Sequence, residues 1–152
     1  MVQISLAGQL ACLAVLLLAG CGVRPTGLAA SLPGSVWLVD RIVETDGSVR
    51  RGTGETVAFG ADGRIALSSC NECSGAYAVS PQGVLTLGAG VACTRRGCPD
   101  GAVELERTMA GPLTMARDGE YLVLSAAAGT PQVILLPDAL AAPTVQPPAQ
   151  TN

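Results

Sequence analysis

The segment SSCNECSGAY, residues 68–77, contains a C-x-x-C pair, and the segment VACTRRGC, residues 91–98, contains a second cysteine pair with C-x-x-x-x-C spacing. Four of the six cysteines of the chain lie in these two short runs. Cysteines spaced in this way form structural disulfides, bind zinc or act as a redox pair. Because the chain has only one Trp, one Phe and two Tyr, the role of these cysteines decides what holds the fold together.

The first twenty residues predict export. They contain an uncharged apolar run that ends in small residues directly before Cys21. The end of this run, LAGC at residues 18–21, resembles the lipobox of bacterial lipoproteins. That resemblance implies a signal peptide over residues 1–20 and a lipid on Cys21. An ordinary cleaved secretory signal and an uncleaved membrane anchor are the alternatives.

We therefore expect a protein of the bacterial cell envelope that is attached to the membrane through the lipid on Cys21. Gly22 follows the cysteine, which by analogy with the enterobacterial sorting rule favours the outer membrane, facing the periplasm. Residues 21–34, rich in Gly, Pro, Ala and Ser, are predicted to form a flexible linker. Residues 137–152, rich in Pro and Ala, are predicted to form a disordered tail. One compact domain remains, over residues 35–136.

Short apolar runs separated by turn residues predict a mainly β domain. Asp-Gly pairs and other turn signals occur between runs of strand length, several of which are rich in β-branched and aliphatic residues. The expected strands are SVWLVDRIV (35–43), ETVAF (55–59), RIALSS (64–69), GAYAV (75–79), VLTL (84–87), EYLVL (120–124) and QVILL (132–136). With shorter segments included, we expect about eight or nine strands in an antiparallel meander.

One segment predicts a helix instead. Asp100 is a suitable N-cap, and Ala102, Leu105 and Met109 follow it at helical spacing. The Gly111-Pro112 pair would end the helix. We expect this single helix to cover an open end or face of the sheet.

The four cysteines of the domain are expected to form two disulfides, because an even number in an exported protein is typical of a disulfide framework. Residues that face each other across an antiparallel pair have position numbers with a nearly constant sum. The nested pairing, Cys70 with Cys98 and Cys73 with Cys93, meets this condition best. Each bridge would contribute about 3–4 kcal/mol in the loop-entropy model.

Zinc binding and redox activity remain as alternatives for the same cysteines. The run CNECSG is superficially similar to a zinc knuckle, but the second cysteine pair does not repeat the C-x-x-C spacing. A reactive C-x-x-C pair usually lies at a helix N-terminus, whereas this pair lies between two predicted strands and encloses Glu72.

The domain resembles the META domain, the family of the heat-shock lipoprotein HslJ. Three segments carry the resemblance: a tryptophan on the first strand, a Cys-Asn-x-x-Ser-Gly-x-Tyr run, and a strand and loop that end in a cysteine. The matching residues are Trp37; Cys70, Asn71, Ser74, Gly75 and Tyr77; and Leu87, Gly88, Thr94 and Cys98. VELERTMAGPL and DGEYLVLS match the helix and the final hairpin, so the resemblance covers residues 35–136.

The resemblance implies an antiparallel, barrel-like β domain with one helix. The resemblance implies no catalytic residues. Members of the family are associated with stress or envelope roles. Cys73 and Cys93 stand where many members have other residues, and their joint presence fits a second bridge between them.

Composition argues against an enzyme. The chain has no His and no Lys, so the usual general base and the Schiff-base amine are both missing. We expect no catalytic residues, no metal ligands and no cofactor. The formal net charge is -3 and the arginines are dispersed except for two pairs, so no nucleic-acid partner is expected. We expect a monomer.

Arg95 and Arg96 are the best candidates for partner binding, because a disulfide-clamped loop would display them and Arg suits carboxylate or phosphate groups. Asn71 is expected mainly to support a turn, and Tyr77 to be a core aromatic residue, although either could contact a ligand. The favoured function is a non-enzymatic envelope lipoprotein in stress response or envelope integrity. The alternatives are a small-ligand or protein-binding inhibitor module that uses the Arg95-Arg96 loop, and a thiol redox or zinc protein.

Overall fold

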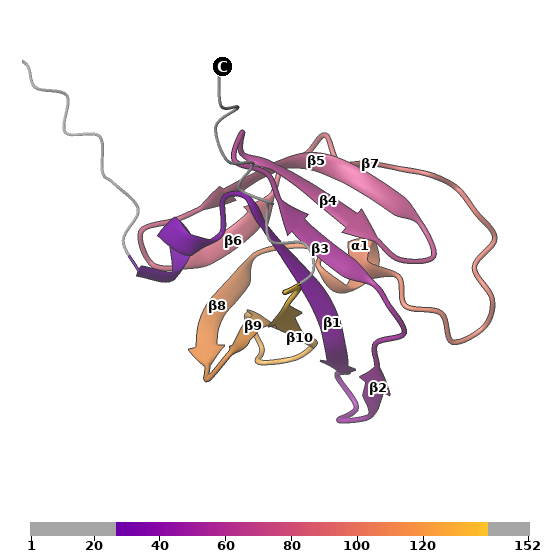
Figure 1. Ribbon diagram of the computed structural model, residues 1–152. Helices are drawn as coiled ribbons and strands as arrows, with labels where there is room; N and C mark the ends of the chain where they lie inside the picture. Colours follow the sequence, from indigo (N-terminus) through magenta and orange to yellow (C-terminus); the bar gives the residue numbers. More distant parts are fainter. Residues whose placement is uncertain (1–26, 140–152) are drawn as a thin grey trace, which may run out of the picture.

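The computed structural model describes residues 27–139 and contains ten β-strands (Figure 1). The strands are β1 (Ser35–Val43), β2 (Val49–Arg51), β3 (Thr56–Phe59), β4 (Arg64–Ser68), β5 (Glu72–Val79), β6 (Val84–Leu87), β7 (Ala92–Cys93), β8 (Leu113–Asp118), β9 (Tyr121–Ala126) and β10 (Gln132–Pro137). A 3-10 helix, η1 (Gly27–Ser31), precedes them, and a single α-helical turn, α1 (Leu105–Thr108), lies between β7 and β8. Within the described residues no helix is long and apolar enough to cross a membrane.

Eight of the strands close into an antiparallel barrel, which confirms the predicted fold class. The order around the barrel is β1-β3-β4-β5-β6-β8-β9-β10, and β10 pairs with β1 to close it. The short strands β2 and β7 add to β1 and β5. Along one edge of β1 the neighbour changes from β3 to β2, and along the other edge the pairing with β10 has a register shift between Val39 and Arg41. Strand β2 therefore pairs with the end of β1 that β3 does not reach.

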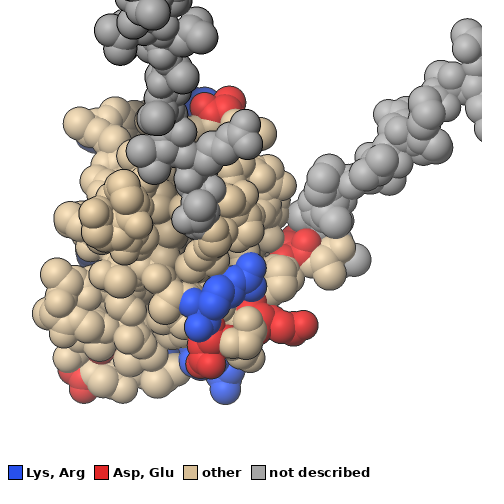
Figure 2. All heavy atoms as spheres, turned by 90° about the vertical axis from the view of Figure 1, so that its left-hand side faces the viewer, with Lys and Arg blue, Asp and Glu red and all other residues tan. Residues whose placement is uncertain are grey.

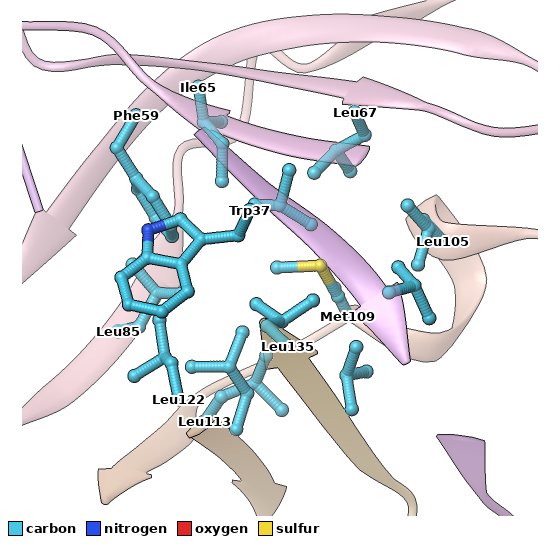
Figure 3. Close-up of a cluster of buried hydrophobic side chains, with 14 of the residues drawn as sticks. Trp37, Phe59, Ile65, Leu67, Leu85, Leu105, Met109, Leu113, Leu122 and Leu135 are labelled. Carbon is cyan, nitrogen blue, oxygen red and sulfur yellow. The ribbon is translucent and has the colours of Figure 1, made fainter. Parts of the chain in front are cut away.

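The core fills the inside of this barrel. In β4, Ile65 and Leu67 are buried while Arg64 and Ala66 are exposed, as expected for a strand with one face inward. The side chains that meet in the centre come from strands on all sides and from α1 (Figure 3). They include Trp37, Phe59, Ile65, Leu67, Leu85, Leu105, Met109, Leu113, Leu122 and Leu135.

The ordered domain is longer at both ends than the sequence indicated. Of the expected linker, residues 27–34 pack against the barrel: Leu32 is completely buried, and the backbone N–H of Gly34 donates to the carbonyl of Phe59 at 2.6 Å. At the other end, Pro137 pairs with Trp37 in the sheet, so the tail does not begin there. The expected signal peptide, Cys21 and most of the expected tail lie outside the described residues.

The expected helix is much shorter than predicted, because its first half is held in another conformation. Only Leu105–Thr108 is α-helical, and Asp100 does not cap it. Gly101 has a φ of 80°, outside the helical region, and the N–H of Leu105 donates to Ser69 Oγ at 3.5 Å instead of to the carbonyl of Gly101. The carbonyls of Gly101 and Ala102 accept hydrogen bonds from the Arg50 side chain at 3.3 and 3.0 Å. The helical spacing holds only for Leu105 and Met109, which are both fully buried.

Candidate functional site

Two nested disulfides crosslink the start of β5 and the turn before it to β7 and the loop that follows it. Cys70 is bonded to Cys98 with 5.7 Å between their Cα atoms, and Cys73 to Cys93 with 4.0 Å. Cys73 and Cys93 are also direct partners in the β5–β7 ladder. This is the pairing that the position numbers favoured. Sulfur atoms in disulfides are not free thiolates, so these four cysteines serve as crosslinks rather than as zinc ligands or a dithiol.

The loop between Cys93 and Cys98, called here the clamped loop, is also held by hydrogen bonds. The N–H of Thr94 donates to the carbonyl of Glu72 at 2.9 Å, and the N–H of Glu72 donates to Thr94 Oγ1 at 3.0 Å. The N–H of Arg96 donates to Asn71 Oδ1 at 2.9 Å. The loop is therefore fixed at both ends by covalent bonds and in the middle by a side chain.

Asn71 joins three segments that are far apart in the sequence. Its side chain is 8% exposed, and its Nδ2 donates to Glu106 Oε1 at 2.9 Å. A carboxylate only accepts hydrogen bonds, so Glu106 fixes the orientation of the amide and turns Oδ1 toward the N–H of Arg96. The second oxygen, Glu106 Oε2, is buried and has no hydrogen-bond partner among the described residues. Asn71 thus supports the clamped loop and ties it to α1, a wider role than the turn that the sequence predicted.

Arg95 and Arg96 are both exposed on the clamped loop. Within residues 27–139 neither guanidinium is part of an ion pair. Their side chains are therefore available to carboxylate or phosphate groups, on a backbone whose conformation is already fixed.

Tyr77 and Gly75, which the family resemblance singled out, serve the packing of the barrel. The Tyr77 ring meets the Phe59 ring edge-on at 5.1 Å, and its hydroxyl donates to the carbonyl of Gly60 at 3.5 Å. Burial, and to a lesser degree the charge of Asp62, raises the pKa of Tyr77. At Gly75 the backbone does not need a positive φ; instead a Cβ would lie 2.6 Å from Val91 Cγ2. Neither residue belongs to the clamped loop.

A groove that sequence reasoning did not indicate lies beside the disulfides. It has a volume of about 620 Å³ and runs between residues 50–55 on one side and residues 99–103 on the other, with Ser68, Ser69 and Cys70 between them. The only sequence feature that could have indicated this groove was the Arg50-Arg51 pair, which is one of two places where basic residues are adjacent.

The face opposite the clamped loop and the groove carries no large patch of one charge. Figure 2 shows the left-hand side of Figure 1, where most of the surface is uncharged and basic and acidic side chains lie next to each other in its lower part. A mixed cluster of this kind gives no patch of one sign for a charged partner. The candidate sites are therefore the clamped loop and the groove.

Comparisons with known proteins agree with the topology. The family model of the META domain matches residues 30–138. An NMR structure of a protein from Burkholderia xenovorans is 18% identical, covers 76% of this chain and 91% of its own, and superimposes with a TM-score of 0.57. A second NMR structure is 19% identical, with 73% and 95% coverage and a TM-score of 0.56. At this identity the two likenesses show the fold alone. The search of curated proteins finds no match.

Proposed function

Because the chain belongs to the META domain family, we propose that it is a non-enzymatic protein of the bacterial cell envelope. In this proposal a lipid on Cys21 anchors it, in the outer membrane facing the periplasm, and its disulfide-stabilised domain serves envelope integrity or the response to stress. The observation that carries the proposal is the pair of nested disulfides, because such bonds persist in the oxidising compartments outside the cytoplasm.

The chemistry of the described side chains supports a non-enzymatic role. The chain has no histidine or lysine, and catalytic carboxylates usually have a raised pKa. In Asp46 and Glu55 the pKa is lowered instead. Hydrogen bonds from Ser48 lower the pKa of Asp46. Burial alone would raise the pKa of Glu55, but hydrogen bonds from Thr53 and from the backbone N–H groups of Gly54 and Glu55 together lower the pKa. Both carboxylates stay ionised as hydrogen-bond acceptors, which gives neither a proton to donate at neutral pH.

The anchor is tested by replacing each of the two N-terminal cysteines. Expressed in a Gram-negative host with a labelled fatty acid, the wild-type chain and Cys12→Ser should both carry the label and sediment with the membranes. Cys21→Ser should carry none, because the thiol that accepts the lipid is gone. Cys12→Ser is the matched control, since it removes a cysteine from the same apolar segment. Label on Cys21→Ser, or an unlabelled wild-type chain, would contradict the anchor.

A second function, binding of an acidic partner, is favoured by one specific observation. The clamped loop presents two exposed guanidiniums without ion pairs among the described residues, and its backbone needs no ordering on binding. The partner would be an envelope protein or a small ligand with carboxylate or phosphate groups. This role is compatible with the anchored domain, because both place the loop in the periplasm.

Capture of partners from envelope extract tests this second function. We expect the wild-type chain to retain a protein that the double variant Arg95→Ala/Arg96→Ala retains at least about tenfold less, since charged hydrogen bonds are worth about 1.5–3 kcal/mol each. Arg95→Lys/Arg96→Lys should be intermediate, because it keeps the charge but loses the planar fork. Arg64→Ala, which removes an exposed arginine elsewhere, is the control. If the same proteins are captured by all four chains, the loop has no such role.

A further inference from the structure

The groove beside the disulfides has the size and the rigidity of a binding site. Its volume of about 620 Å³ lies in the range of small-molecule and peptide sites. A groove of this size is useful for binding only if its two walls keep their spacing without a ligand, since ordering them on binding would cost affinity.

The wall formed by residues 99–103 is held in three places. At one end, the neighbouring Cys98 is bonded to Cys70. At the other end, the N–H of Cys70 donates to the carbonyl of Val103 at 3.4 Å. In between, the Arg50 guanidinium crosses to the carbonyls of Gly101 and Ala102 and also pairs with Glu44. Arg50 therefore holds the two walls together, and its charge is already paired with Glu44.

Two opposite charges remain available, one on each wall. Arg51 has a side chain that is 76% exposed, and its one ion pair, with Asp40, is long at 3.6 Å. Asp100 on the other wall is exposed and has neither an ion pair nor a side-chain hydrogen bond with any of residues 27–139. The other carboxylate of the groove, Glu55, already accepts from the N–H and the hydroxyl of Thr53 at 2.6 and 2.8 Å. Among the described residues, a ligand would therefore meet one weakly paired cation, Arg51, and one anion without a partner, Asp100.

We propose that this groove binds a short peptide with free termini, with Arg51 holding the carboxylate and Asp100 the ammonium group. A simple anion would leave Asp100 unpaired and close to a like charge, and a simple cation would do the same to Arg51. A single amino acid carries both charges but would leave most of about 620 Å³ to water. A short peptide carries both charges, one at each end, and occupies more of the groove than a single amino acid does.

The test uses the full chain, isotopically labelled and kept in detergent micelles, and follows its amide NMR signals. Trialanine with free termini is the probe, and we expect shifts in residues 50–55 and 99–103. Amidation of the peptide's carboxyl end, or acetylation of its amino end, should each weaken binding about tenfold, as expected for the loss of one charged hydrogen bond. In Arg51→Gln the amidated and free peptides should bind alike, and in Asp100→Asn the acetylated and free peptides should bind alike.

The control variant is Arg95→Gln/Arg96→Gln, which removes two exposed arginines from the clamped loop and should leave trialanine binding unchanged. The inference is overturned if the doubly capped peptide binds as well as the free one, if Arg51→Gln binds the free peptide like the wild type, or if no signal of the groove shifts at millimolar peptide. Since these residues differ from those of the clamped loop, capture by the loop can fail while the groove binds, and the reverse.

Discussion

A chain in which Cys70, Cys73, Cys93 and Cys98 are all replaced by alanine is expected to lose about 6 kcal/mol of its free energy of unfolding. Net stabilities of domains lie at about 5–15 kcal/mol, so such a variant would be largely unfolded at 37 °C or close to it. Alanine is preferred to serine because Cys73 is 4% exposed and a hydroxyl there would be buried without a partner.

The two bonds are not expected to contribute equally, because they are nested. The outer bond, Cys70–Cys98, closes a loop with a sequence separation of 28 and is worth about 3.5 kcal/mol by loop entropy. Once it is closed, Cys73 and Cys93 are already connected by a short path through it, so the inner bond has less chain entropy left to remove. It should then add about 2.5 kcal/mol.

Urea unfolding followed by circular dichroism measures these values for the wild type, the two pairwise variants and the fourfold variant. The wild-type chain after reduction has the natural cysteines without the bonds, and it should match the fourfold variant within about 1 kcal/mol. A fourfold variant that unfolds at the wild-type urea concentration would show that the barrel, rather than the crosslinks, supplies the stability.

Replacing Asn71 by alanine is expected to cost about 3 kcal/mol, a large effect for a residue that is not part of the apolar core. Among the described residues, the change removes the only hydrogen bond to the half-buried carboxylate of Glu106, whose second oxygen, Oε2, is buried and already has no partner. It also leaves the N–H of Arg96 without its acceptor. Leaving a buried charge unpaired costs more than the bond itself contributes.

A double-mutant cycle separates the two parts of this cost. If most of the cost comes from leaving the Glu106 carboxylate without its hydrogen bond, Asn71→Ala/Glu106→Ala should be more stable than Asn71→Ala alone. Glu104→Ala is the matched control: Glu104 is also an acidic residue at α1, but its partner Arg107 is 78% exposed, and its loss should cost less than about 1 kcal/mol. Strictly additive costs for Asn71 and Glu106 would rule out their coupling.

The sequence predicts best those strands whose limits depend only on residues within and next to the strand. The limits of β1 and β6 agree with the runs SVWLVDRIV and VLTL, because their apolar residues and turn signals are local. Strand β8 was missed although Leu113 and Met115 point inward, since Ala116, Arg117 and Asp118 follow as exposed residues and the segment begins beside a Gly-Pro pair. The short strands β2 and β7 have too few residues to show any periodicity.

The helix and the site depended on contacts that the sequence does not display. Gly101 has a φ of 80°, which is incompatible with a helix that starts at Asp100, and its carbonyl accepts a hydrogen bond from Arg50, 51 positions away. Asn71 and Glu106 are 35 positions apart, so the support of the clamped loop could not be inferred from the run around Asn71. The disulfide pairing could be predicted because Cys73 and Cys93 face each other in the antiparallel β5–β7 ladder, and Cys70 and Cys98 lie on the two chain segments that continue from it.

The pairing of β1 with β10 determines when the barrel can close. A chain that is threaded through a membrane has to remain unfolded until it has passed. The barrel cannot close before Gln132–Pro137 is delivered, because β1 has no other partner along that edge. Pairings between distant parts of a chain also form slowly. If the chain is exported as proposed, this topology delays folding until almost the whole domain has emerged, and the translocation channel receives a chain without a finished domain to obstruct it.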